Sequence, residues 1–117
     1  NNNYIMANIF KLSNIIFKEK IKNIYVKYRL PSLNNEYYLI KWLPNVETDF
    51  HGHNGKECKF ILLKGSYLFE ERLNNNSFVK SCGKIKPFKV YHINDKIGIH
   101  KMINSENKIK WSFHKYY

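Results

Sequence analysis

Residues 51–65 have the sequence HGHNGKECKFILLKG, in which two histidines, a turn and an apolar run follow one another closely. Asn54-Gly55 is a turn dipeptide, and residues 60–63 have the apolar character of a buried strand. Side chains two residues apart on a strand project to the same face, so the two imidazoles would lie side by side, as adjacent metal ligands do. Taken alone, the pair is equally compatible with ordinary polar or core histidines.

An ambiguity follows at Glu57-Cys58, since neighbouring strand residues face opposite sides and only one of them can enter the interior. An inward Glu57 would add a carboxylate to the histidines. An inward Cys58 would leave neutral ligands around a divalent metal with open positions. Alternation favours Cys58, because it shares a face with Phe60 and Leu62.

Working outward from this stretch, the chain after residue 35 contains about seven short strand-like runs separated by turns. Aromatic and β-branched residues dominate these runs, which predicts a mainly β sandwich or small barrel over residues 36–117. Before it, apolar residues at helical spacing between Asn8 and Val26 predict one or two short helices, ended by Pro31. We therefore expect a helical N-terminal segment (1–30) and one domain (1–117), with no internal repeat.

Two further strand-like runs near the end of the sequence also contain histidines. In residues 97–102, His100 lies on the same face as Gly98, which would leave room for a metal or a substrate; an exposed strand histidine is the alternative. In residues 108–116, Ser112, His114 and Tyr116 share one face, which indicates a hydrogen-bonded chain. His92 has no such neighbours, and we expect it at the surface.

The composition indicates a single folded domain but gives little information about function. The formal net charge is +11, yet 18 of the 20 basic residues are lysines, whereas base and phosphate recognition relies on arginine. We expect no nucleic-acid partner. Two cysteines do not form a secreted disulfide framework, no apolar run is long enough for a membrane span, and no signal peptide is visible. We expect a cytoplasmic monomer without a membrane partner.

Three motifs resemble the type I cysteine dioxygenases, a family of cupin enzymes. His51-Gly52-His53 with Cys58 resembles the variant first cupin motif of that family, in which Cys replaces Glu. Residues 91–101, YHINDKIGIHK, resemble its "YINDxIGLHR" stretch, and Ser112-x-His114-x-Tyr116 is similar to its SxHxY segment. Trp42 also falls in register with a family tryptophan. The resemblance covers about residues 24 to 117; family members continue past the tyrosine with further strands and a lid.

This resemblance implies a jelly-roll-like cupin barrel with a defined site. It implies that Fe(II) is held by His51, His53 and His100, and that L-cysteine and O2 react to give cysteine sulfinic acid, a step of cysteine catabolism and taurine biosynthesis. Further roles are implied for other residues: Tyr116 beside the substrate, oriented by Ser112 and His114; a thioether crosslink of Cys58 with Tyr116; and Arg29 with Tyr28 at the substrate carboxylate. The family arginine lies in a Tyr-x-Arg context, and Tyr28-Arg29 is one residue tighter.

Other functions also fit these residues. Related families with the same three histidines oxidise 3-mercaptopropionate, cysteamine or an amino-terminal cysteine. A catalytically idle metal-binding cupin is a further alternative.

Overall fold

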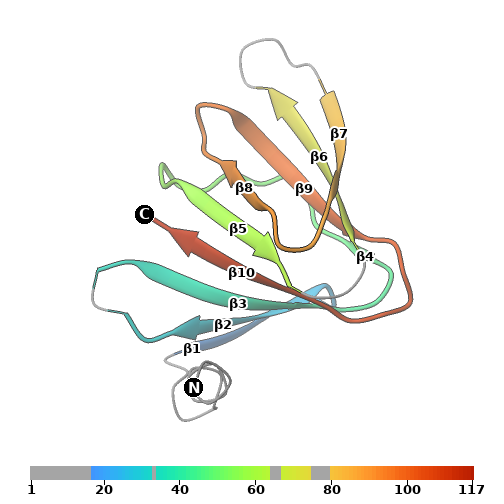
Figure 1. Cartoon of the computed structure of the whole chain (residues 1–117), viewed down its shortest axis with the longest axis horizontal. Helices are drawn as coiled ribbons and strands as arrows, with labels where there is room; N and C mark the ends of the chain where they lie inside the picture. Colours follow the sequence, from blue (N-terminus) through green and yellow to red (C-terminus); the bar gives the residue numbers. More distant parts are fainter. Residues whose placement is uncertain (1–16, 33, 64–66, 75–79) are drawn as a thin grey trace.

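The computed structural model describes residues 17–32, 34–63, 67–74 and 80–117, which form ten strands in two antiparallel sheets (Figure 1). The six-stranded sheet has the order β1-β2-β3-β10-β5-β8, and the four-stranded sheet has the order β4-β9-β6-β7. The strands are β1 (Phe17–Ile21), β2 (Tyr25–Leu30), β3 (Glu36–Trp42), β4 (Val46–Glu47), β5 (Cys58–Leu62), β6 (Leu68–Asn74), β7 (Lys80–Ile85), β8 (Val90–Ile93), β9 (Gly98–Asn104) and β10 (Lys110–Tyr116).

The core lies between the two sheets, and strand alternation determines which residues enter it. On β5, Cys58, Phe60 and Leu62 are buried, while the residues between them are more exposed. Strand β10 pairs with β5 on one side and with β3 on the other, so the inward residues of the three strands form a continuous layer. Each of these three strands buries every second residue over most of its length. The β architecture predicted for residues 36–117 is therefore confirmed in the part that the structure describes.

The facing sheet contributes the other half of the interior through β9 and β6. Strand β9 alternates strictly, with His100, Met102 and Asn104 buried. Its neighbour β6 buries Leu68 and Glu70. The interior is therefore apolar in part and contains several polar side chains, which need partners when they are buried.

Residues 17–30 are strands, so the helical segment predicted there is wrong. They form a β1–β2 hairpin, closed by a turn in which the Ile24 amide donates to the Ile21 carbonyl at 3.1 Å and Lys22 has a φ of 51°. The run Tyr25–Leu30 is aromatic and β-branched, and its pairing with β3 outweighs the local helical spacing. Residues 1–16 of the predicted helical segment lie outside the described residues. In the part described, no helix is long and apolar enough to cross a membrane.

The segment from His51 to Glu57 is a loop fastened at both ends. At one end, His51 and His100 pair through their backbones, with N to O distances of 2.9 and 3.1 Å. At the other end, Glu57 and Tyr117 pair in the same manner, at 2.8 and 3.0 Å. The sequence predicted a strand for His51-Gly52-His53; instead an isolated bridge and a turn hold these residues.

Candidate metal centre

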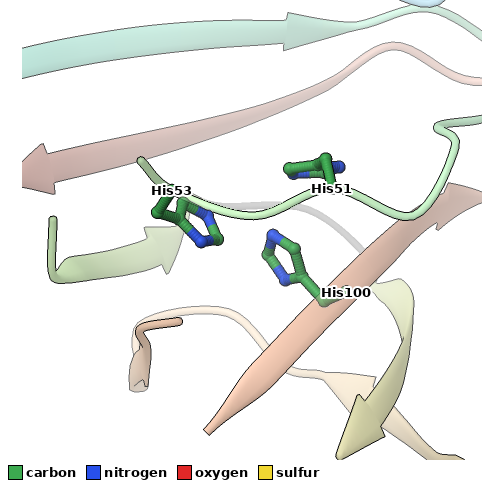
Figure 2. A group of neighbouring side chains, drawn as sticks. All are labelled: His51, His53 and His100. Atoms are coloured by element: carbon green, nitrogen blue, oxygen red, sulfur yellow. The ribbon is translucent and has the colours of Figure 1, made fainter. Parts of the chain in front are cut away.

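Three histidines from the two motifs converge at one end of the barrel, where His53 and His100 are buried and His51 is more exposed. His51 and His53 lie on the loop before β5, and His100 projects from β9 toward them (Figure 2). One ring nitrogen from each lies within 4.8 Å of the others. The ring centroids are 4.5 Å apart for His51 and His100, 4.9 Å for His53 and His100, and 5.6 Å for His51 and His53. The predicted ligands therefore form one cluster.

Two of the imidazoles are held neutral, which is the form that binds a metal. Burial lowers the pKa of His51, and the nearby His100 lowers it further. Burial, together with the neighbouring His100 and His51, lowers the pKa of His53 to about 4. Near neutral pH both rings therefore offer an unprotonated nitrogen.

Hydrogen bonds orient two of the rings. The Nδ1 atom of His100 lies 2.8 Å from Oε2 of Glu70, and Nδ1 of His51 lies 3.0 Å from the carbonyl oxygen of Asp49. Since both partners are acceptors, each Nδ1 carries a hydrogen, and Nε2 is the nitrogen left for a metal. The pattern matches metal-ligating histidines, which donate their other ring N–H to a carboxylate or a carbonyl.

Glu70 is itself fixed by a second buried contact. Its Oε1 accepts a hydrogen bond of 2.8 Å from Nε of Arg72, whose Nη2 donates to the His92 carbonyl at 2.9 Å. Burial alone would raise the pKa of Glu70, but the hydrogen bonds from His100 and Arg72 outweigh it and lower that pKa. Glu70 thus remains a carboxylate that holds His100 in place.

The third ring supplies an independent test of the fit. Among the described residues, Nδ1 of His53 is a buried side-chain atom with no hydrogen-bond partner. An unpaired buried polar atom is costly, and a metal-ligand bond is one way to satisfy it. Three imidazoles with this orientation fit a divalent first-row transition metal such as Fe, Co, Ni, Cu or Zn.

The structure resolves the Glu57-Cys58 ambiguity. Cys58 faces the interior and is fully buried, as alternation favours. Glu57 faces the outside, where its carboxylate lies 3.3 Å from Nε2 of His92 and accepts from Asn94 at 3.3 Å. His92 is partly exposed on this outer face. The segment after the histidines therefore turns a thiol, and not a carboxylate, toward the interior.

Cys58 and Tyr116 are register partners on β5 and β10. Burial raises the pKa of the Cys58 thiol to about 12, and it raises the pKa of the Tyr116 phenol as well. Both groups are therefore protonated at neutral pH. Tyr116 also lies near the histidines, with its ring centroid 5.9 Å from that of His53.

The hydrogen-bonded chain predicted on β10 is present, but it leads from Ser112 and His114 to Cys58 and not to Tyr116. The indole of Trp42 donates to Oγ of Ser112 at 2.8 Å, and that hydroxyl lies 2.6 Å from Nε2 of His114. The other nitrogen of His114 lies 3.8 Å from the sulfur of Cys58. Tyr116 instead stacks on His114, with the ring centroids 6.3 Å apart. Trp42, Ser112 and His114 thus lead to the thiol.

A pocket of about 380 Å³ opens beside the histidines, and the half-buried cation in its lining is Lys27. The Lys27 ammonium lies 4.1 Å from the ring centroid of Tyr38 and 5.0 Å from that of Tyr116. Burial lowers the pKa of Lys27, and nearby carboxylates partly offset this decrease. At the mouth of the pocket, Lys56 forms an ion pair with Glu36.

The two residues predicted to hold a substrate carboxylate are placed differently. Tyr28 lies on the outer face of the sheet, where its ring stacks on Trp111 at 6.3 Å between centroids. Arg29 shares the face of Lys27 by alternation but does not line the pocket. Neither Tyr28 nor Arg29 thus lines the pocket beside the histidines, whereas Lys27 does.

Sequence reasoning missed Lys27 and Glu70. A signal for Lys27 was present, since Tyr25-Val26-Lys27 has the Tyr-x-basic spacing that Tyr28-Arg29 lacks. No signal in the sequence linked Glu70 to His100, which is 30 residues away. The space expected beside Gly98 is also filled: a Cβ there would lie 2.1 Å from the Leu73 carbonyl oxygen. That glycine permits close packing of β9 on β6.

No family model and no curated protein matches this sequence. Among solved structures, a Drosophila melanogaster CENP-C bound to CAL1 has a TM-score of 0.77 at 6% identity, over 99% of this chain and 92% of that chain. A Drosophila melanogaster CENP-C cupin domain has a TM-score of 0.68 at 11% identity, over 86% and 74%. A recombinant oxalate oxidase in complex with glycolate has a TM-score of 0.69 at 10% identity, over 92% of this chain and 59% of that chain. These similarities show that the chain has the cupin fold.

Proposed function

We propose that this chain is an Fe(II)-dependent thiol dioxygenase that converts L-cysteine and O2 to cysteine sulfinic acid. The observation that supports it best is the ligand set: His51, His53 and His100 converge, and the side chain that enters the interior after them is Cys58 instead of Glu57. The motif resemblance to cysteine dioxygenases supports the same reaction.

A neutral ligand set suits an anionic sulfur ligand. Three imidazoles leave the charge of a divalent ion uncompensated, so a thiolate substrate is favoured there and its deprotonation becomes easier. When bound, ferrous iron would supply the redox chemistry that joins both atoms of O2 to the sulfur. His51, His53 and His100 would hold the ion, and Glu70 would keep His100 in position.

Lys27 is the group that would hold the substrate carboxylate. It lies in the pocket next to the histidines, between Tyr38 and Tyr116, where water is partly excluded. An ammonium in such a place forms a stronger charge-assisted bond than one at the surface. We therefore assign to Lys27 the role that the family resemblance implied for Arg29 and Tyr28.

Tyr116 and Cys58 would act next to Lys27 and the histidines. The Tyr116 phenol stays protonated, so it can donate a hydrogen bond to the substrate. The pairing of Cys58 with Tyr116 across β5 and β10 also supports the thioether crosslink. Its formation joins the sulfur to a ring carbon and removes two protons and two electrons, with O2 as the oxidant.

The test is O2 uptake by the iron-loaded protein with L-cysteine, with the product identified by mass spectrometry. The expected product is the sulfinic acid, heavier than cysteine by two oxygen atoms. Parallel reactions with 3-mercaptopropionate and cysteamine rank the substrates, and Lys27 predicts a preference for the thiols that carry a carboxylate. No uptake with iron fully bound would contradict the proposed oxidation.

One observation favours a second candidate, an idle metal-binding cupin. A CENP-C structure that matches almost the whole chain is described as bound to CAL1, so a domain of this shape can serve protein binding. The clustered histidines and their oriented nitrogens favour the enzyme instead. A cytoplasmic monomer without nucleic-acid or membrane partners remains the prediction from the sequence.

A further inference from the structure

We propose that Asp95 is a positioning residue for the metal centre: its carboxylate fixes the backbone of the loop that carries His53, so that this ring faces His51 and His100. The inference rests on the metal-binding half of the proposed function and is independent of the thiol oxidation.

The carboxylate of Asp95 binds two backbone amides of the histidine loop. The amide of His53 donates to Oδ1 at 2.7 Å, and the amide of Gly55 donates to Oδ2 at 2.6 Å. Hydrogen bonds from neutral amides to a carboxylate are stronger than those between neutral groups. The same two bonds lower the pKa of Asp95, so the group is ionised at neutral pH.

The loop needs such a contact in its middle. It is anchored to β9 at His51 and to Tyr117 at Glu57, but the residues between belong to no strand. Asn54 and Gly55 have φ values of 53° and 80°, a left-handed turn that brings the Lys56 amide to the His53 carbonyl at 3.0 Å. Asp95 binds the amides of the first and third residues of this turn, His53 and Gly55.

Gly52 provides a separate sign that the contact is close. A Cβ placed on Gly52 would lie 2.9 Å from Oδ1 of Asp95, which is closer than real Cβ contacts. Its backbone φ is not in the left-handed region, so the requirement for glycine here comes from the approach of the carboxylate. The residue between the two histidines is thus adapted to Asp95.

Asp95 is held by the turn that begins the strand of the third histidine. In that turn, the Ile97 amide donates to Oδ1 of Asn94 at 2.9 Å, and the Gly98 amide donates to the Asn94 carbonyl at 3.1 Å. Strand β9 starts at Gly98 and brings His100 to the site two residues later. One turn therefore sets the positions of His100 and His53 together.

The experiment compares cobalt(II) binding by the full chain with binding by Asp95→Asn. This substitution replaces one acceptor with an NH2 group and removes the charge, so we expect at least about tenfold weaker binding, as is typical for groups that orient metal ligands. The visible absorption of bound cobalt reports ligand geometry, and it should change even at saturating cobalt. A residue that only stabilised the fold would leave that spectrum unchanged.

Two matched controls isolate the effect. Glu47→Gln removes one carboxylate from an exposed ion pair with Lys101, next to His100, and should keep both affinity and spectrum. Gly52→Ala moves Asp95 away from the other side and should reproduce the loss. Gly83→Ala, where a Cβ meets nothing within 4 Å, should not.

The outcomes separate the two proposals. Unchanged affinity and spectrum in Asp95→Asn would overturn the role of Asp95, and so would unchanged binding in Gly52→Ala if Asp95→Asn failed to fold. Wild-type protein that binds no cobalt would overturn both proposals. Wild-type protein that binds cobalt at the histidines but does not oxidise thiols when loaded with iron would overturn the thiol oxidation alone.

Discussion

The two ends of the barrel interior treat buried polar groups in opposite ways. At the end that contains His51, His53 and His100, Nδ1 of His53 is buried without a hydrogen-bond partner among the described residues, and a pocket opens beside the rings. At the other end, where β9 finishes and β10 begins, Lys110 and Asn104 are buried and each is held by at least two protein groups.

The contacts at the second end are those of a structural network. The Lys110 ammonium donates to the Tyr67 carbonyl at 3.1 Å and to Glu106 at 2.5 Å. The Asn104 amide donates to the Leu43 and Lys108 carbonyls at 2.9 and 2.7 Å. Polar groups that are satisfied internally stabilise the fold, whereas the unpaired Nδ1 of His53 at the histidine end is available to a ligand.

The largest expected effect is the loss of a metal ligand at the histidine end. His100→Ala should abolish cobalt or iron binding at micromolar metal, because two imidazoles remain from the three that converge, and it should abolish sulfinate formation with it. Metal content after dialysis measures the effect. His92→Ala, at a partly exposed histidine on the outer face, is the control and should retain full binding. Near-full occupancy in His100→Ala would exclude that residue as a ligand.

The matching change at the end that contains Lys110 and Asn104 should destabilise the fold and leave metal binding unchanged. Asn104→Leu keeps the branched shape of the side chain but leaves the Leu43 and Lys108 carbonyls without their donor, so the free energy of unfolding should fall by roughly 3 kcal/mol. Urea unfolding measures the loss. Cobalt affinity of the folded variant should stay within twofold of the wild type; a large drop would show that the two ends are coupled.

A smaller effect is expected from the cation in the pocket. Lys27→Met removes the ammonium that would bind the substrate carboxylate, so KM for cysteine should rise about tenfold or more, the effect of losing a charged hydrogen bond. Turnover of cysteamine, which lacks the carboxylate, should change little. Arg29→Met is the comparison variant, and a larger rise in KM there would reverse the assignment between the two residues.

The smallest effect is a pH dependence of the metal-free protein. Burial lowers the pKa of His114 well below its usual value, and the nearby His100 and Lys27 add to the shift. Below about pH 6.5 the unfolded chain binds a proton at His114 that the folded chain does not. The free energy of unfolding therefore decreases as the pH is lowered, by at most about 1.4 kcal/mol per pH unit. Urea unfolding at pH 7 and pH 5 measures this slope. The slope should be shallower in His114→Gln; an equal slope would assign the effect to other groups.

The sequence predicted the β architecture and the histidine cluster because both depend on alternation and on local motifs. Cys58 faces inward because Phe60 and Leu62 do, and His100 faces inward with Met102. The cupin fold expected from the motifs is confirmed by the structural similarities.

What the sequence did not predict depends on contacts between distant segments. Helical spacing around Ile21 and Ile24 suggested a helix, but pairing with β3 makes the segment Tyr25–Leu30 a strand. That pairing also turns Tyr28 to the outside and Lys27 into the pocket. The Glu70 and Asp95 contacts span 30 and 42 residues, beyond any local pattern.

The long separation of these contacts has a consequence for how the centre is assembled in time. His53 meets Asp95 across 42 residues, and Glu57 meets Tyr117 after the last strand has paired. Loops of this length close slowly, and proteins dominated by such pairings fold in milliseconds to seconds. Until β9 and β10 are in place the three imidazoles are far apart, so folding precedes metal capture. Cells that lack the metal should therefore accumulate folded apoprotein ready to be loaded.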